Sequence, residues 1–251
     1  MNEIIEWLKS YSTGSGAGKF IVGISGGIDS ALVSTLCAES GIPTILVSMP
    51  IHQQQHELNR AHNHIKWLKN KYDNVSSVEI NLSHVYDTFE MMFADNEHKL
   101  ALANSRARLR MTTLYQIAQT NGGLVVGTGN KVEDFGVGFF TKYGDGGVDI
   151  SPIADLMKSE VREMAKELGV NQEILTASPT DGLWGDGRTD EDQLGATYDE
   201  LEWAMMVTKE EFSKYSSWSD RKKEVWRIYN RFNSINKHKM RPIPVFIKKE
   251  K

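Results

Sequence analysis

The most informative segment of the sequence is Phe20-Ile21-Val22-Gly23-Ile24-Ser25-Gly26-Gly27-Ile28-Asp29-Ser30. Its apolar, β-branched first half predicts a buried strand, and residues 31–40, followed by Gly41, predict a helix. The two glycines between them allow a tight turn in which the backbone approaches a ligand closely. N–H groups at the start of the helix can then bind an anion, assisted by the helix dipole. The stretch therefore predicts a strand, a phosphate-binding loop and a helix.

One residue of this loop, Asp29, is an unusual neighbour for a phosphate. Like charges would repel unless a divalent cation lay between them, so the loop indicates magnesium. Ser25 and Ser30 add hydroxyl groups that can donate to the same anion. A plainer interpretation is that Asp29 and Ser30 merely cap the helix, since both residue types are good N-caps.

The pattern of this unit is repeated outward along the chain. Further strands are predicted over residues 44–48, 77–80 and 123–127, and helices over residues 1–11, 53–70, 85–95 and 100–120. Strands alternating with helices predict an α/β fold, a Rossmann-like parallel sheet flanked by helices on both faces. A Gly-rich polar loop is predicted up to Ser151, and beyond Lys158 only helices follow, over residues 159–168, 171–175, 190–206, 209–215 and 219–232. We therefore expect one domain, 1–251, with a helical C-terminal extension.

Composition excludes several classes of protein. The chain has 251 residues, 40% of them hydrophobic and 25% charged, which is typical of a globular protein. No apolar run approaches the ~20 residues of a membrane-spanning helix, so no membrane partner is expected. The single cysteine, Cys37, cannot form an internal disulfide and is expected in the core. These features favour the reducing cytoplasm.

Charge is distributed unevenly. Residues 1–207 hold 16 basic and 28 acidic side chains, whereas residues 208–251 hold 13 and 5. The basic segment could meet nucleic acid, a phosphorylated small ligand, or the acidic part of its own chain or of a partner subunit. A solvated helical face explains the same charges without any partner.

A second glycine-rich string, Gly14 to Lys19, invites comparison with a Walker A phosphate loop. Lys19 is followed by Phe20 where a Ser or Thr should bind magnesium, and the string precedes a strand instead of following one. We therefore expect only a turn after the first helix.

The loop from Ser25 to Ser30 resembles the pyrophosphate loop of the ATP pyrophosphatase superfamily, whose members cleave ATP between its α and β phosphates and adenylate a substrate oxygen. Further motifs resemble the ammonia-dependent NAD synthetases over nearly the whole chain, and the most specific is the phenylalanine pair with its Thr-Lys-Tyr-Gly-Asp-Gly continuation. The motifs are Asn104 to Arg110, Gly127 to Glu133, Phe139 to Asp149, Lys158, Ser178 to Thr180, Asp190 to Asp199 and Lys237 to Lys239. The resemblance implies the adenine nucleotide alpha hydrolase-like fold. It also implies a ligase that amidates deamido-NAD with ammonia, giving NAD, AMP and pyrophosphate.

The resemblance also implies roles for individual residues. Asp29, Lys158 and Thr180 would be catalytic, and Asp29 and Glu133 would hold Mg²⁺. ATP would be bound by Gly23, Ile24, Ser25, Gly26, Gly27, Ile28, Asp29, Ser30, Thr128, Lys158 and Thr180. Deamido-NAD would be bound by Arg108, Lys142, Asp149, His238 and Lys239. Alone, Arg106, Arg108 and Arg110 would suggest an exposed, salt-bridged helix face.

Two departures from the family pattern stand out. One extra residue lies between Glu133 and Phe139, and Asp181 to Trp184 replaces a commoner Ala-Asp-Leu. We expect Lys237 to Arg241 to form a mobile arm that orders over bound substrate, because Pro242 and Pro244 cannot continue a helix. A homodimer is expected from the family and from surplus apolar positions in residues 85–120.

Two other functions compete with amide formation. RNA thiolation within the same superfamily would use the basic segment, but it usually needs extra cysteines or an RNA-binding domain, and the chain has one cysteine. A non-catalytic nucleotide-binding protein would have no reason to keep Asp29, Glu133, Lys158 and Thr180 together. A glutamine-using synthetase would need an amidase domain with a cysteine nucleophile, for which no candidate exists. We therefore expect no nucleic-acid partner and free ammonia as the nitrogen donor.

Overall fold

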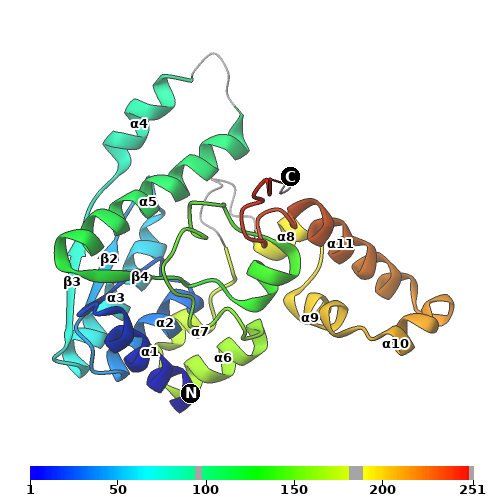
Figure 1. Ribbon diagram of the computed structural model, residues 1–251, viewed down its shortest axis with the longest axis horizontal. Helices are drawn as coiled ribbons and strands as arrows, with labels where there is room; N and C mark the ends of the chain where they lie inside the picture. The colour runs from blue at the N-terminus through cyan, green and yellow to red at the C-terminus, as the bar shows by residue number, and fades with distance from the viewer. Residues whose placement is uncertain (94–97, 181–188, 249–251) are drawn as a thin grey trace.

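The computed structural model describes residues 1–93, 98–180 and 189–248. Four strands form one parallel sheet in the order β3-β2-β1-β4, namely β1 (Lys19–Gly23), β2 (Thr44–Ser48), β3 (Val75–Glu79) and β4 (Gly123–Val126) (Figure 1). The four strands predicted from the sequence are thus confirmed, with small differences at their ends. β1 lies inside the sheet, with Ile21 paired to Ile45 on one side and to Val125 on the other.

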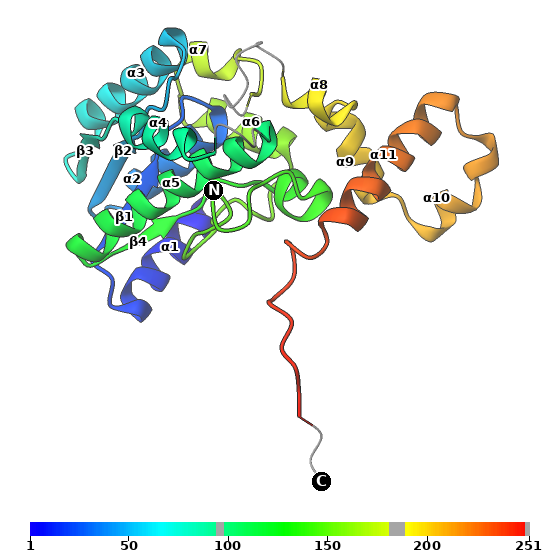
Figure 2. The ribbon, with the colours of Figure 1, turned by 90° about the horizontal axis from the view of Figure 1, so that it is seen from above.

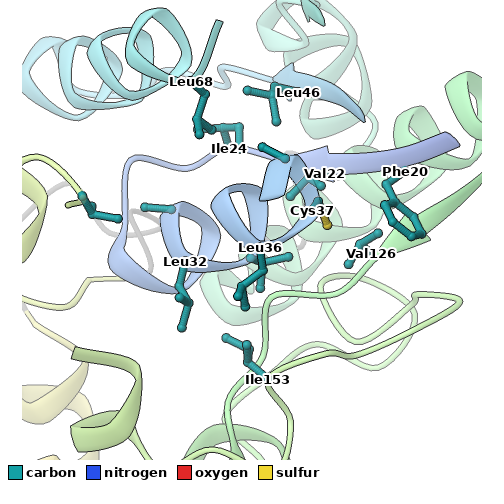
Figure 3. Close-up of a cluster of buried hydrophobic side chains, with 14 of the residues drawn as sticks. Phe20, Val22, Ile24, Leu32, Leu36, Cys37, Leu46, Leu68, Val126 and Ile153 are labelled. Atoms are coloured by element: carbon teal, nitrogen blue, oxygen red, sulfur yellow. The ribbon is translucent and has the colours of Figure 1, made fainter. Parts of the chain in front are cut away.

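Helices cover both faces of this sheet, as predicted. On one face lie α1 (Asn2–Ser15), α2 (Ile28–Glu39), α3 (Gln55–Lys71) and α6 (Lys158–Glu167), whose apolar side chains share one core with Phe20 and Val22 (Figure 3). On the other face lie α4 (Ser83–Met91) and α5 (Lys99–Asn121), which pack over Ile21 and Val125. Successive strand residues point to opposite faces, so alternate residues of β1 belong to different cores.

Cys37 lies in the first of these cores and is fully buried (Figure 3). Burial raises the pKa of its thiol far above the ordinary value. The prediction of a core cysteine is therefore confirmed, and a buried, protonated thiol is a poor nucleophile.

The C-terminal extension builds a third core beside the sheet. It comprises α7 (Gln172–Leu175), α8 (Asp190–Leu194), α9 (Tyr198–Met206), α10 (Lys209–Ser213), the 3-10 turn η3 (Tyr215–Ser217) and α11 (Asp220–Asn236). Tyr198, Leu201 and Val225 pack there against Val132 and Val137. Figure 2 shows α9, α10 and α11 projecting to one side of the body.

Several predicted helices were wrong in their bounds, and two of them bear on the site. The single helix expected over residues 190–206 is broken, because Gly195 adopts a left-handed φ of 79° and Thr197 caps a new helix by accepting from the Glu200 N–H. The first helix continues past residue 11 to Ser15 and ends at Gly16, so Gly14 is helical and Lys19 opens a strand. The latter confirms that Gly14 to Lys19 is not a phosphate loop.

The Gly-rich loop after β4 contains a π-helical turn, η2 (Val132–Val137), which was not predicted. A π-turn holds one residue more in each hydrogen-bonded ring than an α-turn. The turn keeps Val132 and Val137 both buried, and the extra residue expected between Glu133 and Phe139 stays a prediction.

Among the described helices, none combines the length and apolar character needed to cross a membrane.

Candidate active site

The site lies where the strand order reverses. β1 is flanked by β2 and β4, so the connections leaving β1 and entering β4 lie on opposite faces and open a crevice at the carboxyl ends of these two strands. A cavity of about 810 Å³ occupies this place, large enough for a nucleotide ligand. It is lined by every residue predicted for the site except Gly26 and Asp149: Gly23, Ile24, Ser25, Gly27, Ile28, Asp29, Ser30, Arg108, Thr128, Glu133, Lys142, Lys158, Thr180, His238 and Lys239.

The phosphate loop is held by its own serines. The Gly27 N–H donates to Ser25 Oγ at 3.1 Å, the two hydroxyl oxygens of Ser25 and Ser30 lie 3.1 Å apart, and Ser30 Oγ donates to the Gly27 carbonyl at 2.9 Å. Gly27 is the N-cap of α2, and within the described chain no side chain caps this helix. The interpretation that Asp29 or Ser30 is merely a cap is therefore wrong, and the N-terminus of α2 faces the cavity.

Gly26 supports the loop from behind. Its φ is 84°, and a Cβ built on it would lie 2.7 Å from the Glu57 carbonyl oxygen of α3. Arg60 of the same helix donates to the Gly26 carbonyl at 3.3 Å. The left-handed conformation and the contact with α3 both require glycine at this position, which explains why Gly26 does not line the cavity.

Lys158, the first residue of α6, joins the predicted metal ligands. Its Nζ lies 2.6 Å from Asp29 Oδ2 and 3.0 Å from Glu133 Oε1, and its side chain is only 3% exposed. Burial alone would lower the pKa of this ammonium, but the two carboxylates outweigh it and raise the pKa above the ordinary value. The lysine is therefore charged at neutral pH.

Two residues that sequence reasoning missed complete this cluster. Asn130 is buried, and its side-chain NH₂ group donates to Asp29 Oδ1 at 3.1 Å. Its side-chain oxygen Oδ1 accepts from the Val132 and Glu133 N–H groups. Tyr198 is also buried; its hydroxyl donates to Glu133 Oε1 at 2.6 Å, and its ring centroid lies 4.7 Å from Lys158 Nζ. Both residues stand inside quoted motifs, Asn130 in Gly127 to Glu133 and Tyr198 in Asp190 to Asp199, so the motifs offered a signal for each. The position of Tyr198 depends on how the extension folds back.

Asp134, the neighbour of Glu133, also lines the cavity. Burial, reinforced by the negative charges of Glu133, Asp145 and Asp29, raises the pKa of its carboxyl group to about 7. Burial similarly raises the pKa of Tyr198, and the nearby carboxylates of Glu133 and Asp190 add to the effect. Carboxyl groups are therefore concentrated in this part of the cavity, which favours a cation here.

The opposite wall of the cavity is basic. Lys142 Nζ donates to the His238 carbonyl at 3.1 Å, Arg108 donates to the Lys142 carbonyl at 3.3 Å, and Lys239 Nζ donates to the Phe140 carbonyl at 2.7 Å. Lys239 Nζ also lies 5.0 Å from the Phe140 ring centroid. Cationic side chains from three separate segments thus gather around one part of the cavity.

The expectation of a mobile arm over residues 237–241 was wrong. α11 extends to Asn236, and the Lys239 and Met240 N–H groups donate back to Asn236 and Lys237. With the Lys239 side chain held by Phe140, this segment is a packed turn. An extended tail begins only at Pro242 and runs away from the body (Figure 2).

Two other side chains depart from expectation. Asp149 does not line the cavity. Its carboxylate accepts hydrogen bonds from the Tyr115 hydroxyl at 3.0 Å and from the Val125 N–H at 2.8 Å. Arg110 is not part of an exposed face, because it donates to the Met49 carbonyl at 3.1 Å and to Gln53 at 2.9 Å. Burial, together with the charge of Arg106, lowers the pKa of Arg110 to about 10.

Thr128 and Thr180 enter the cavity from different loops, one after β4 and one after α7. The replacement at Asp181 to Trp184 lies outside the described residues.

The donor set fits one divalent cation held jointly with a ligand. Asp29 and Glu133 present carboxylate oxygens, which Mg²⁺ prefers. In the described part of the chain, no three His, Cys, Asp or Glu side chains meet in a way that could hold a metal by themselves. Two carboxylates with phosphate oxygens are a common magnesium arrangement.

Comparison with known proteins identifies the family. The family model described as NAD synthase matches residues 1–243. The chain belongs to the NAD synthase family. It is 41% identical over 207 residues to the NH(3)-dependent NAD(+) synthetase of Mesoplasma florum (80% of this chain, 82% of that one) and 37% identical over 257 residues to that of Alkaliphilus metalliredigens (97% of each). The family and the ligase class expected from the sequence are confirmed.

Solved structures of this family share the fold. The structure of NMN synthetase from Francisella tularensis has a TM-score of 0.85 and 31% identity, covering 97% of this chain and 95% of that one. The NH3-dependent NAD synthetase from Campylobacter jejuni has a TM-score of 0.78 and 23% identity, covering 98% and 97%. The likeness to the second shows the fold alone.

Proposed function

We propose that this NAD synthase family member amidates deamido-NAD with ammonia, consuming ATP and releasing AMP and pyrophosphate through an adenylated carboxylate. The observation that carries the proposal is the joining, in one cavity, of the Ser25 to Ser30 loop, the Lys158 cluster and the basic wall. A nucleotide polyphosphate, an acyl substrate and a second phosphate-bearing group each have a chemically suited surface there.

Activation of a carboxylate requires an electrophile held in line with it. The N-terminus of α2 and the hydroxyl groups of Ser25 and Ser30 would bind the β and γ phosphates, so the α phosphate is presented to the substrate carboxylate. Thr128, Thr180 and Lys158 would contact ATP from the other loops. Lys158 would stabilise the negative charge that develops on the departing pyrophosphate.

Asp29 and Glu133 would hold Mg²⁺ beside these phosphates, where the ion would neutralise their charge and act as a Lewis acid. Arg108, Lys142, His238 and Lys239 would bind the dinucleotide, whose two phosphates match their charge. Ammonia must reach the adenylate before water does, so bound ATP and dinucleotide would have to fill the cavity and exclude water.

A second candidate substrate is deamido-NMN. It is favoured by the similarity to the Francisella tularensis structure, which is described as an NMN synthetase. The two substrates share the nicotinate carboxylate and differ by an AMP unit. The chemistry at Lys158 is therefore the same for both, and the distinction rests on the basic wall.

The experiment measures NAD or NMN formed, with AMP as co-product, from each deamido substrate with ATP, Mg²⁺ and ammonium. We expect a higher specificity constant for deamido-NAD. Asp29→Ala should lower turnover by at least about 10², with a smaller loss for Glu133→Ala. Preference for deamido-NMN would overturn the substrate assignment, and full activity of Asp29→Ala would overturn the assignment of the loop.

The site would work within a symmetric homodimer in the cytoplasm. α4 and the start of α5 leave large apolar side chains outside both cores: Met91 is 70% exposed, Met92 73% and Leu100 53%. The C-terminal tail also leaves a large apolar side chain in solvent, because Phe246 is 91% exposed. Such surfaces suit a two-fold interface, and light scattering at micromolar concentration should report twice the chain mass. An active monomer would contradict it.

A further inference from the structure

We infer that Lys158 is a built-in counter-ion that occupies the seat of the metal in the free protein, so that a divalent cation enters only together with a nucleotide polyphosphate. The inference rests on the proposed function for the identity of the polyphosphate. It assigns Lys158 a second role, in excluding free metal, beyond contact with ATP.

The geometry places the ammonium where the metal would go. Lys158 Nζ lies 2.6 Å from Asp29 Oδ2 and 3.0 Å from Glu133 Oε1. Mg²⁺ bound to the same two oxygens would lie about 2.0 to 2.1 Å from each. The ammonium and the metal would therefore occupy overlapping space, and two cations so close together would repel each other.

The remaining contacts keep both carboxylates turned toward this seat. The second oxygen of Asp29 accepts from Asn130, and Glu133 Oε1 accepts a second hydrogen bond from the Tyr198 hydroxyl. Because the described residues offer no third metal-binding side chain at the seat, a free divalent cation would gain two ligands at most. It would also have to displace a well-placed ammonium.

A polyphosphate changes this balance by giving the ammonium another anion. Lys158 is the first residue of α6, where the positive end of the helix dipole disfavours a cation, so its position depends on the two carboxylates. The Ser25 to Ser30 loop follows β1 and begins the helix that carries Asp29, and it lines the same cavity. Phosphates bound there would draw the ammonium away and add oxygen ligands for the metal.

The test measures Mn²⁺ binding, by calorimetry and by the Mn²⁺ electron paramagnetic resonance signal, to the whole chain without nucleotide. We expect no saturable binding by the natural protein up to about 1 mM Mn²⁺, and binding of one ion at least about tenfold tighter by Lys158→Met. The double variant Asp29→Asn, Lys158→Met should lose this gain. Lys131→Met is the matched control, because Lys131 pairs with Asp155 at 2.8 Å on the surface, and it should not gain binding.

Equal Mn²⁺ affinity of the natural protein and Lys158→Met would overturn the inference. If Lys158→Met does not fold, the natural protein alone decides: tight Mn²⁺ binding without nucleotide overturns the inference, and binding only with α,β-methylene ATP supports it. None of these binding measurements requires turnover of deamido-NAD. A wrong substrate assignment and a wrong role for Lys158 therefore give different results.

Discussion

At the scale of single residues, one buried charge cluster connects the sheet to the extension. Asp29 comes from the start of α2, Glu133 from the π-turn, Lys158 from the start of α6 and Tyr198 from the start of α9. Removing one partner of a buried ion pair leaves a charge without compensation, which is costly. The cluster therefore serves stability and the reaction together, and variants must be chosen to separate the two.

Tyr198→Phe separates them. The variant keeps the buried ring over Lys158 and loses only the hydroxyl that donates to Glu133 at 2.6 Å. A hydrogen bond to a charged group contributes about 1.5 to 3 kcal/mol, so Glu133 becomes less well placed. We expect an increase of about tenfold in the Mg²⁺ concentration for half-maximal activity, a smaller change in kcat, and a fall in Tm of roughly 3 to 12 °C.

The control is Tyr229→Phe, which lies in the third core of the extension, away from the cavity lining. It should leave the magnesium dependence as it was. If kcat of Tyr198→Phe at saturating Mg²⁺ fell by as large a factor as the Mg²⁺ requirement rises, Tyr198 would not act through Glu133.

His64 makes stability depend on pH. It is fully buried between α3 and α2, with Nε2 2.9 Å from Ser34 Oγ, and burial lowers its pKa from 6.5 to about 4. The unfolded chain therefore takes up a proton that the native protein refuses. His64 therefore costs no stability above pH 6.5. As the pH falls from 6.5 toward 4, protonation of the unfolded chain lowers the free energy of unfolding by up to about 3 kcal/mol.

Denaturant titrations at several pH values check this. His64→Gln should flatten the decline below pH 6.5. Asp134, with its pKa raised to about 7, acts in the opposite direction, because the native protein retains a proton and loses stability as the pH rises from about 4 to 7. Asp134 is present in both proteins, so their difference isolates His64, and parallel pH profiles would refute the prediction.

At the scale of elements, the site depends on how two loops are shaped. The Ser25 to Ser30 loop keeps its form through Gly26, pressed against α3. The loop after β4 forms a π-turn, and this turn places Glu133 beside Lys158. Neither loop owes its shape to regular secondary structure, so each depends on a few close contacts.

Gly26→Ala tests this dependence. The added Cβ would lie 2.7 Å from the Glu57 carbonyl oxygen, so the loop or α3 must move. The alanine would also have to adopt the backbone φ of 84° that glycine has here. Strain of this kind costs about 1 to 3 kcal/mol. We expect kcat/KM for ATP to fall by at least about tenfold, as measured by AMP release.

Gly18→Ala is the matched control. A Cβ on Gly18 meets no described atom within 4 Å, and its φ is not positive. Unchanged ATP kinetics are expected, because Gly14 to Lys19 is not a phosphate loop. A similar loss in both variants would mean that Gly26 is not specifically required.

At the scale of the whole molecule, the extension closes the site. Its core packs against Val132 and Val137 of the π-turn, and α11 leads into the turn that carries His238 and Lys239. The basic C-terminal segment is thereby brought to the acidic part of the same chain. Most of its charge remains on exposed helical faces, but Lys239 enters the cavity lining together with His238.

Lys239→Ala tests the basic wall. Lys239 is half-buried, and its ammonium would reach a phosphate of the dinucleotide from its position at Phe140. We expect kcat/KM for deamido-NAD to fall by an amount equivalent to about 1 to 3 kcal/mol, with a smaller effect on ATP. The exposed neighbour Lys237→Ala is the control and should change neither. Unchanged deamido-NAD kinetics in Lys239→Ala, together with retardation of tRNA at physiological salt, would favour a nucleic-acid role.

Local features of the fold follow from the sequence alone. The β-branched run before Ser25 and the alternation of strands and helices predict the layered parallel sheet, because these patterns depend on neighbouring residues. The motif resemblance identified the family, and nearly all of the residues that it implied for the site line the cavity. Fifteen of the seventeen predicted positions do so; Gly26 supports the loop from behind, and Asp149 is bound by Tyr115 and Val125.

Contacts between distant segments became visible only in the folded chain. The strand order, which opens the crevice between β1 and β4, depends on long-range pairing that no local pattern specifies. The seating of Lys158 between Asp29 and Glu133, with the Tyr198 ring beside it, joins residues separated by up to 169 positions. Burial is collective: whether a charge is solvated or enclosed depends on everything packed around it, and this sets both its pKa and its partners.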